Sequence, residues 1–210
     1  MYSLTLMLTL LGGALVAAPA AAQVLGLPVV NSGVPTGVNL AADVGFSNVD
    51  AGKATTIGAS ATVGLGFIGV TGTIARYTPK GGDGIWIPGV SGTLRLLGGP
   101  LIPLRVMVQG GISQWTIANV TQTHLPVSIG LAATIPTPGF AIKPWVAPRI
   151  DVVRTSSPQL SGTDTEARFA ISGGVELSLL SGVSLRATYD KVSARIGKPA
   201  ILSFGLGFAP

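Results

Sequence analysis

The sequence predicts an all-β fold: a closed, antiparallel, up-and-down transmembrane β-barrel of ten strands, with eight strands as the alternative. Three observations support this prediction. Apolar residues alternate with small or polar ones at a period of two from about residue 38 to the end of the chain. The connections between these segments are alternately short and long. Charged residues make up 10% of the chain and the mean hydropathy is +0.60, whereas soluble domains are about 25% charged.

The alternating segments are expected to be the strands, in chain order. Their ranges are 38–47, 56–67, 70–77, 89–97, 104–115, 125–135, 142–153, 166–179, 183–192 and 201–208. In the last of them, Leu202, Phe204, Leu206 and Phe208 share one face, and mostly small residues share the other. We expect this segment to seal the barrel against residues 38–47.

The connections divide into two kinds. Tight turns rich in Gly and Pro follow the second, fourth, sixth and eighth segments. The other connections are longer and more polar, and they cover residues 48–55, 78–88, 116–124, 154–165 and 193–199. Short turns on the inner side and long loops on the outer side are typical of barrels that span an outer membrane.

The N-terminal part divides into a leader and an irregular stretch. Residues 1–22 contain an apolar run at 4–16, and Ala20, Ala21 and Ala22 form a small-residue cleavage site. This pattern predicts a cleaved signal peptide, with a single anchor helix as the alternative. Residues 23–36 are apolar but interrupted by proline and glycine, so we expect an irregular periplasmic lead-in. Residues 37–210 then form the barrel domain.

Helical alternatives explain the sequence less well. Residues 106–142 carry no charge and are long enough to span a membrane twice. They contain Gly110, Gly111, Pro126 and Pro136, however, and their many Thr, Val and Ile residues favour strands. A soluble, secreted β-sandwich remains the other all-β alternative.

The leader, the alternation and the closing segment with Gly205, Leu206 and Phe208 together resemble the small bacterial outer-membrane β-barrel proteins. The resemblance covers about residues 38–208. It implies secretion to the periplasm, insertion into the bacterial outer membrane and outer-membrane lipid as a partner. It also implies that the C-terminal strand carries the signal for the barrel-assembly machinery, although Ala209 and Pro210 follow the aromatic Phe208.

The charged residues at lumen-facing positions form the candidate site. This predicted lumen cluster comprises Asp43, Arg95, Arg105, Lys143, Arg149, Asp151, Arg168, Glu176, Arg186 and Asp190. Glu176 and Arg186 are predicted to lie opposite each other and could pair. Arg95 and Arg105 are predicted to lie nearly opposite as like charges, which costs energy unless a carboxylate or a bound anion lies between them. The cluster predicts either a polar filling of a narrow lumen or a constriction that favours small anions.

The residue inventory limits the chemistry. The chain has no cysteine and one histidine, His124, so we expect no metal site, no cofactor and no catalytic residues. The 13 basic residues are scattered, which argues against nucleic acid as a partner. The sequence thus predicts a non-enzymatic barrel with a structural or surface-interaction role through its long loops. The alternatives are a narrow pore for small solutes and, with less support, a lipid-modifying enzyme that uses His124 with Ser128.

Overall fold

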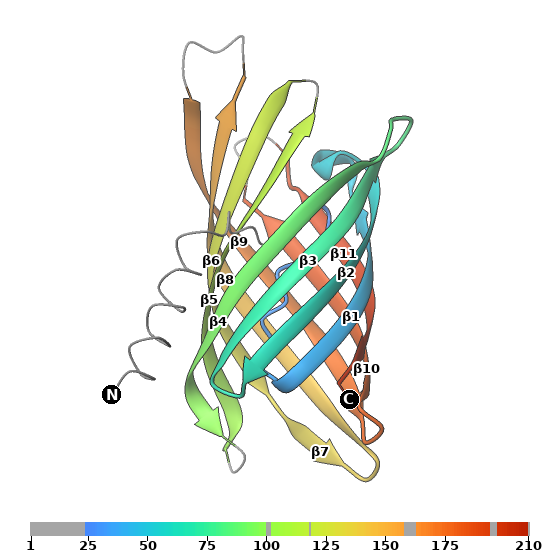
Figure 1. Cartoon of the computed structure of the whole chain (residues 1–210), viewed down its shortest axis with the longest axis vertical. Coiled ribbons are helices and arrows are strands. Elements are labelled where there is room, and N and C mark those ends of the chain that lie inside the picture. The colour runs from blue at the N-terminus through green and yellow to red at the C-terminus, as the bar shows by residue number, and fades with distance from the viewer. Residues whose placement is uncertain (1–23, 100–101, 118, 158–162, 194–196, 210) are drawn as a thin grey trace, which may run out of the picture.

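The computed structural model describes residues 24–99, 102–117, 119–157, 163–193 and 197–209, and they form a closed β-barrel (Figure 1). The strands are β1 (Thr36–Ser47), β2 (Ala54–Leu65), β3 (Ile68–Pro79), β4 (Ile85–Gly99), β5 (Ile102–Ile117), β6 (Val120–Ala133), β7 (Ile135–Thr137), β8 (Phe140–Ser156), β9 (Thr163–Leu179), β10 (Val183–Val192) and β11 (Ala200–Phe208). A short 3-10 helix, η1 (Val49–Ala51), precedes β2. The predicted all-β fold is confirmed.

Ten antiparallel strands close the ring. Strands β1 to β6 pair in sequence, β6 pairs with β8, and β8 to β11 continue round to β1. The seam runs from Leu40 opposite Phe208 to Ser47 opposite Ile201, as the sequence predicts. Closure pairs the backbone groups of the wall with one another, which a barrel requires in lipid. The short strand β7 continues the line of β6 after a break at Thr134 and pairs with the start of β8.

The outer face of the barrel is apolar. Alternate side chains of every barrel strand point outward, and large apolar ones among them are more than a third exposed, including Leu40, Ile57, Ile74, Leu94, Ile129, Ile171, Leu185 and Phe204. Such a continuous exposed apolar surface far exceeds what a soluble monomer tolerates. It is the belt that a transmembrane barrel presents to lipid.

A separate search for helical spans gave a negative result. Within the described ranges, no helix has the length and hydropathy to cross a bilayer.

Two ends of the barrel can be distinguished. At the short-turn end, tight connections join β2 to β3 and β9 to β10. At the loop end, the hairpins β5–β6 and β8–β9 stand taller than the rest of the wall (Figure 1). The predicted loop over residues 116–124 is wrong, because the strands stay paired up to Ile117 opposite Val120. Polar cross-strand contacts such as Gln114 Nε2 to Thr123 Oγ1 at 3.2 Å stabilise this extension.

Residues 24–35, which we call the lumen segment, lie inside the barrel. Val24, Leu27, Val29 and Val34 are each at most 8% exposed. The segment runs from the apolar residues at the loop end down to Pro35, whose carbonyl accepts a hydrogen bond from Gly66 N at 2.9 Å. Residues 23–36 were predicted to be an irregular periplasmic lead-in. The structure instead places it in the lumen, where its apolar side chains meet an apolar wall. The predicted signal peptide, residues 1–22, lies outside the described residues.

Candidate functional site in the barrel lumen

Glycines on the inner wall make room for the lumen segment. A Cβ atom on Gly45 would collide with the Gly26 carbonyl oxygen, and one on Gly64 with the Pro35 carbonyl oxygen. On the other side of the barrel, a Cβ on Gly130 would lie 2.5 Å from Asn31 Cγ. Backbone oxygens cannot move away as a flexible side chain can, so the wall is shaped to this segment along its length.

An apolar cluster closes the lumen toward the loop end. Val24 and Leu27 of the lumen segment pack with wall residues that all point inward near that end: Ala54, Ala75, Tyr77, Ile87 and Trp115. Each of these residues is at most 8% exposed. Apolar side chains on the inner face of a barrel gain stability only when something apolar covers them. The lumen segment covers them and buries them from water.

A second apolar cluster lies lower on the opposite wall. It contains Met107, Ala132, Trp145 and Ala147, with Val30 of the lumen segment packed against it. Close by, Asn31 Nδ2 donates a hydrogen bond to Ser128 Oγ at 3.1 Å. The lumen segment is therefore held at two apolar contacts and at specific polar ones.

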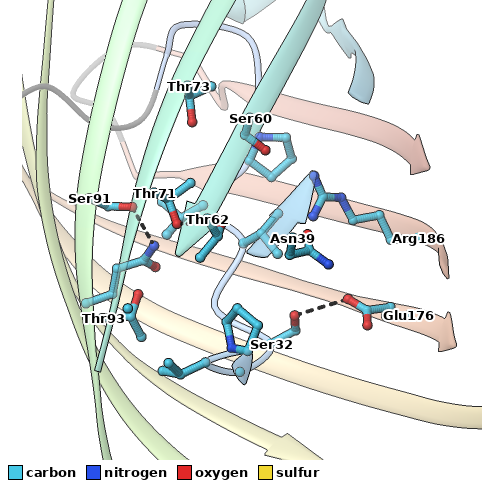
Figure 2. A pocket seen from close by; sticks show the side chains of 18 of the residues that line it. Ser32, Asn39, Ser60, Thr62, Thr71, Thr73, Ser91, Thr93, Glu176 and Arg186 are labelled. Carbon is cyan, nitrogen blue, oxygen red and sulfur yellow. Dashed lines mark hydrogen bonds between the residues drawn. The ribbon is translucent and has the colours of Figure 1, made fainter. Parts of the chain in front are cut away.

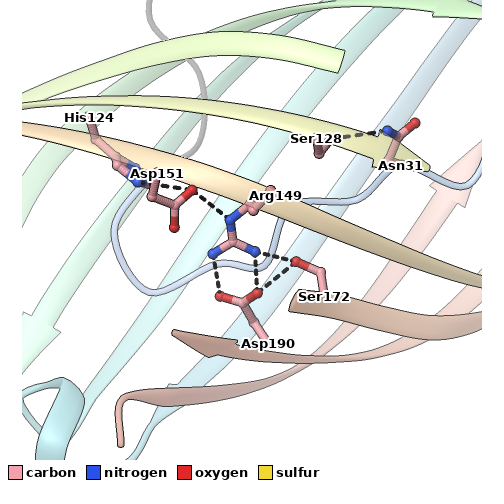
Figure 3. A network of polar contacts seen from close by, with 7 residues as sticks. All are labelled: Asn31, His124, Ser128, Arg149, Asp151, Ser172 and Asp190. Carbon is pink, nitrogen blue, oxygen red and sulfur yellow. Dashed lines mark hydrogen bonds and ion pairs between the residues drawn. The ribbon is translucent and has the colours of Figure 1, made fainter. Parts of the chain in front are cut away.

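Arg149 on β8 is the centre of a buried charge network (Figure 3). Its Nε donates to Asp151 Oδ1 at 2.7 Å, and its Nη2 donates to Asp190 Oδ2 on β10 at 2.9 Å. Ser172 on β9 donates to Asp190 at 2.6 Å. Each of the three charged residues is at most 4% exposed. Two carboxylates surround one guanidinium, and the network ties three neighbouring strands together.

His124 extends this network toward the loop end. Its Nε2 atom lies 3.4 Å from Asp151 Oδ1, and its ring meets Trp115 edge-on with centroids 6.3 Å apart. This acidic partner was not predicted from the sequence, because Asp151 is 27 positions away from His124 and reaches it only through the pairing of β6 with β8. Ser128 instead meets Asn31. His124 and Ser128, the two residues of the lipid-modifying alternative, therefore have different partners.

Two further ion pairs lie nearer the short-turn end. Arg186 on β10 binds Asp43 on β1, with Nε to Oδ1 at 2.7 Å. Lys143 Nζ binds Glu176 Oε1 at 2.9 Å, and Ser32 of the lumen segment donates to Glu176 Oε2 at 3.3 Å. Glu176 and Arg186 are opposite in register, as predicted, but each has its ion pair with another residue.

The remaining members of the predicted lumen cluster are three arginines. Arg168 lies nearer the loop end and pairs with Glu166 at 2.6 Å. Arg95 on β4 and Arg105 on β5 lie on neighbouring strands near the short-turn end, offset by two positions because Arg95 is opposite Met107. Within the described ranges, neither side chain has an acidic partner. The structure thus brings eight of the ten predicted residues into ion pairs and leaves these two apart.

A polar cavity of about 380 Å³ lies between the lumen segment and the wall formed by β1 to β5 (Figure 2). Hydroxyl and amide side chains cover the wall side, namely Asn39, Ser60, Thr62, Thr71, Thr73, Ser91, Thr93 and Gln109. The pairs Arg186–Asp43 and Lys143–Glu176, together with Arg105, complete the lining. The cavity reaches the short-turn end, where Thr36, Gly69 and Ala209 line it. This hydroxyl wall was not predicted from the sequence, although Ser and Thr residues at alternate inward positions of 60–73 and 91–93 indicate it.

Metal coordination has no support in the described part of the chain. No group of three or more His, Cys, Asp or Glu side chains there is arranged to hold a metal ion. The chemistry of the lumen is that of hydrogen bonds and ion pairs.

Comparisons with known proteins identify the fold. No protein-family model matches the sequence, and no curated protein matches it either. Among solved structures, the β domain of the Bordetella autotransporter BrkA is similar at 13% identity and a TM-score of 0.53, covering 82% of this chain and 98% of that one. The outer membrane enzyme PagL is 13% identical with a TM-score of 0.43, covering 82% and 99%. The outer membrane protease OmpT from Escherichia coli is 10% identical with a TM-score of 0.42, covering 84% and 93%.

One prediction needs correction in the light of these structures. The sequence analysis predicts that the protein is not an enzyme, and that exclusion is wrong, because PagL and OmpT are enzymes with barrels of this kind. Their low identity transfers no activity to this chain. The closed ring of ten strands, the apolar outer belt and these similarities lead to one conclusion: the chain has the fold of the bacterial outer-membrane β-barrels.

Proposed function

We propose that this protein is a bacterial outer-membrane β-barrel whose lumen is closed by its own N-terminal segment and whose role is structural or lies in surface interaction. The observation that carries the proposal is the fit of residues 24–35 to the wall. The segment meets two apolar clusters, and wall glycines stand where any side chain would collide with it. A barrel that kept its lumen free for solutes would have no use for an apolar inner wall.

The surface role rests on the two tall hairpins. β5–β6 and β8–β9 continue as paired strands beyond the other connections at the loop end (Figure 1). Their outward positions change there from large apolar residues to polar ones such as Gln114, Thr121 and Thr165. Polar strands that rise above an apolar belt face water, so they present a firm surface to a partner outside the membrane.

The proposed location in the outer membrane rests on the apolar belt and on the end of the barrel at which the first and last strands, β1 and β11, meet the short turns. An outer membrane receives barrels with short turns on the periplasmic side, and both β1 and β11 meet the short-turn end. We therefore assign the short-turn end to the periplasm and the loop end to the cell exterior, with outer-membrane lipid around the wall and assembly through the C-terminal strand β11.

Conductance tests the closed lumen. Wild-type protein in a planar lipid bilayer is expected to show no channel steps, whereas a variant that lacks residues 24–34 is expected to conduct. Steady conductance of the wild type would contradict the proposal and favour the narrow pore for small solutes. If neither protein conducts, the lumen segment is not what closes the barrel.

Cysteine labelling tests the orientation of the barrel. Because the chain has no native cysteine, an introduced cysteine is the single thiol that can react. Thr165→Cys on the tall β8–β9 hairpin is expected to react with a membrane-impermeant maleimide on intact cells. Leu180→Cys, in the β9–β10 turn where the native side chain is 87% exposed, is the matched control and should react only after lysis. The opposite pattern would reverse the proposed orientation.

A further inference from the structure

The ion pairs of the lumen leave one region with unmatched positive charge. The carboxylates of Asp43, Asp151, Glu166, Glu176 and Asp190 each lie in an ion pair with Arg or Lys. Arg105 and Arg95, in contrast, have neither an ion pair nor a side-chain hydrogen bond within the described ranges. The part of the lumen near these two residues therefore carries net positive charge.

Arg105 points into the polar cavity. Its Nε atom is buried and has no hydrogen-bond partner in the described structure. Its Nη1 would lie 3.1 Å from a Cβ on Gly33, so the guanidinium of this half-buried residue rests against the lumen segment. A buried cationic donor without an acceptor is costly, and a bound anion is the group that removes the cost.

The wall across the cavity supplies a second kind of contact. Asn39, Ser60, Thr73 and Thr93 line it, and their side chains make no hydrogen bond to the rest of the described protein. Gln109 donates to Ser91 at 3.2 Å, while its own Oε1 is buried and unpartnered. These groups both donate and accept hydrogen bonds, as the hydroxyl groups of a sugar require.

The size and position of the cavity limit the ligand. About 380 Å³ lies within the range of small-ligand sites and fits a single sugar ring with an anionic substituent. The apolar cluster of Tyr77, Ile87 and Trp115 closes the loop end, whereas the lining continues to Thr36 and Ala209 at the short-turn end. A ligand would enter from the short-turn end.

We propose that this cavity binds a small hydroxylated anion, such as a sugar phosphate, with Arg105 holding the anionic group and the hydroxyl wall holding the ring. Arg95, next to Arg105 on the neighbouring strand, raises the positive potential at the entrance. The proposal requires that the ligand binds in the cavity and does not require that it crosses the barrel, so it does not depend on whether the lumen conducts.

Isothermal titration calorimetry on the full barrel in zwitterionic detergent tests the site, with glucose 6-phosphate, inorganic phosphate and glucose as probes. We expect glucose 6-phosphate to bind at least tenfold more tightly than either phosphate or glucose. Arg105→Gln should weaken glucose 6-phosphate and phosphate about tenfold or more, the usual effect of removing a charged hydrogen bond. Thr93→Val, which keeps the side-chain shape, should weaken only the sugar phosphate.

Matched controls separate binding from damage to the fold. Arg168→Gln removes another lumen arginine, one already paired with Glu166 outside the cavity lining, and should leave every affinity unchanged. Heat-modifiable migration shows whether each variant is folded. Absence of binding by all three probes, or equal affinities for folded Arg105→Gln and wild type, would overturn the proposal. If phosphate binds as tightly as glucose 6-phosphate, the hydroxyl wall does not contribute to binding. If glucose binds as tightly as glucose 6-phosphate, the anionic group does not contribute to binding.

Discussion

The Leu27 Cδ1 atom lies 2.6 Å from the point where a Cβ atom on Gly58 would stand. This contact joins the lumen segment to the inner face of β2, and comparable contacts recur at Gly64 on the same strand, at Gly45 on β1 and at Gly130 on β6. Because the wall has glycine at these points, the lumen segment fits against it in one position. The lumen segment is thus as much a part of the packed interior as a core element of a soluble protein.

A methyl group on Gly45 should dislodge the lumen segment. In Gly45→Ala the new Cβ meets the backbone oxygen of Gly26, which cannot move without shifting the segment. We expect a Val29→Cys probe, at a site where the native side chain is 4% exposed, to react faster with maleimide in the Gly45→Ala background. Gly92→Ala is the control, because its Cβ would meet nothing within 4 Å. Equal reaction rates in all backgrounds would contradict the fit.

Loss of the Arg149 side chain should destabilise the barrel strongly. Arg149→Met leaves Asp151 and Asp190 buried as uncompensated carboxylates, which typically costs about 3–5 kcal/mol. Urea unfolding in lipid vesicles, followed by tryptophan fluorescence, measures the free energy of unfolding. Arg168→Met provides the comparison, because the Arg168 side chain is 34% exposed and its ion pair should contribute about 1 kcal/mol or less. A similar decrease in the free energy of unfolding in both variants would contradict the conclusion that Arg149 is the centre of the buried charge network.

A charge in the middle of the outer belt should be costly. Ile129 on β6 is 52% exposed on the lipid face, and Ile129→Arg is expected to cost about 2–4 kcal/mol in a bilayer. Thr55→Arg, on the outward face near the loop end of β2, should cost about 1 kcal/mol or less because an interfacial arginine reaches water. If the two variants unfold at the same urea concentration, the belt does not face lipid as we assign it.

The C-terminal aromatic residue should matter for assembly beyond its packing. Phe204 and Phe208 on β11 are 48% and 46% exposed on the same face, so their contacts with lipid are alike. We expect Phe208→Ala to slow conversion to the heat-modifiable form in cells, because we propose that this residue is part of the assembly signal in β11. Phe204→Ala should convert at close to the wild-type rate. Equal delays in folding of the two variants in pulse-chase labelling would contradict a special role of Phe208. Such a role would not require Phe208 to be the terminal residue, since Ala209 and Pro210 follow it.

The alternation of residue types predicts much of the wall. It assigns the ten strands, the pairing of β1 with β11 and the inward direction of residues such as Asp43, Arg149 and Asp190. These features are local, because a period of two decides which face each side chain joins. The three outward-facing charges of the described strands, Arg76, Arg154 and Lys191, all lie toward the loop end, where the belt gives way to water.

Contacts between distant parts of the chain were not predictable in this way. The lumen segment has no regular period, so nothing in residues 24–35 alone shows that they pack against Trp115 or Trp145. The Arg186–Asp43 pair spans the intervening strand β11, where both residues are opposite Gly205. The His124–Asp151 contact is diagonal across the paired strands β6 and β8, so it depends on their exact register. The tall hairpins were missed for another reason: their paired Thr and Gln residues have the composition of loops.

The direction of the lumen segment bears on the order of folding. Residue 24 lies toward the loop end, and the segment continues without a break into β1, one side of the seam with β11. Once the seam has formed, the segment could reach its seat only by threading lengthwise through a ring already crowded with side chains. We therefore expect the strands to assemble around residues 24–35 and the β1–β11 seam to form last. In that order of folding, this short segment serves as an internal template for the barrel.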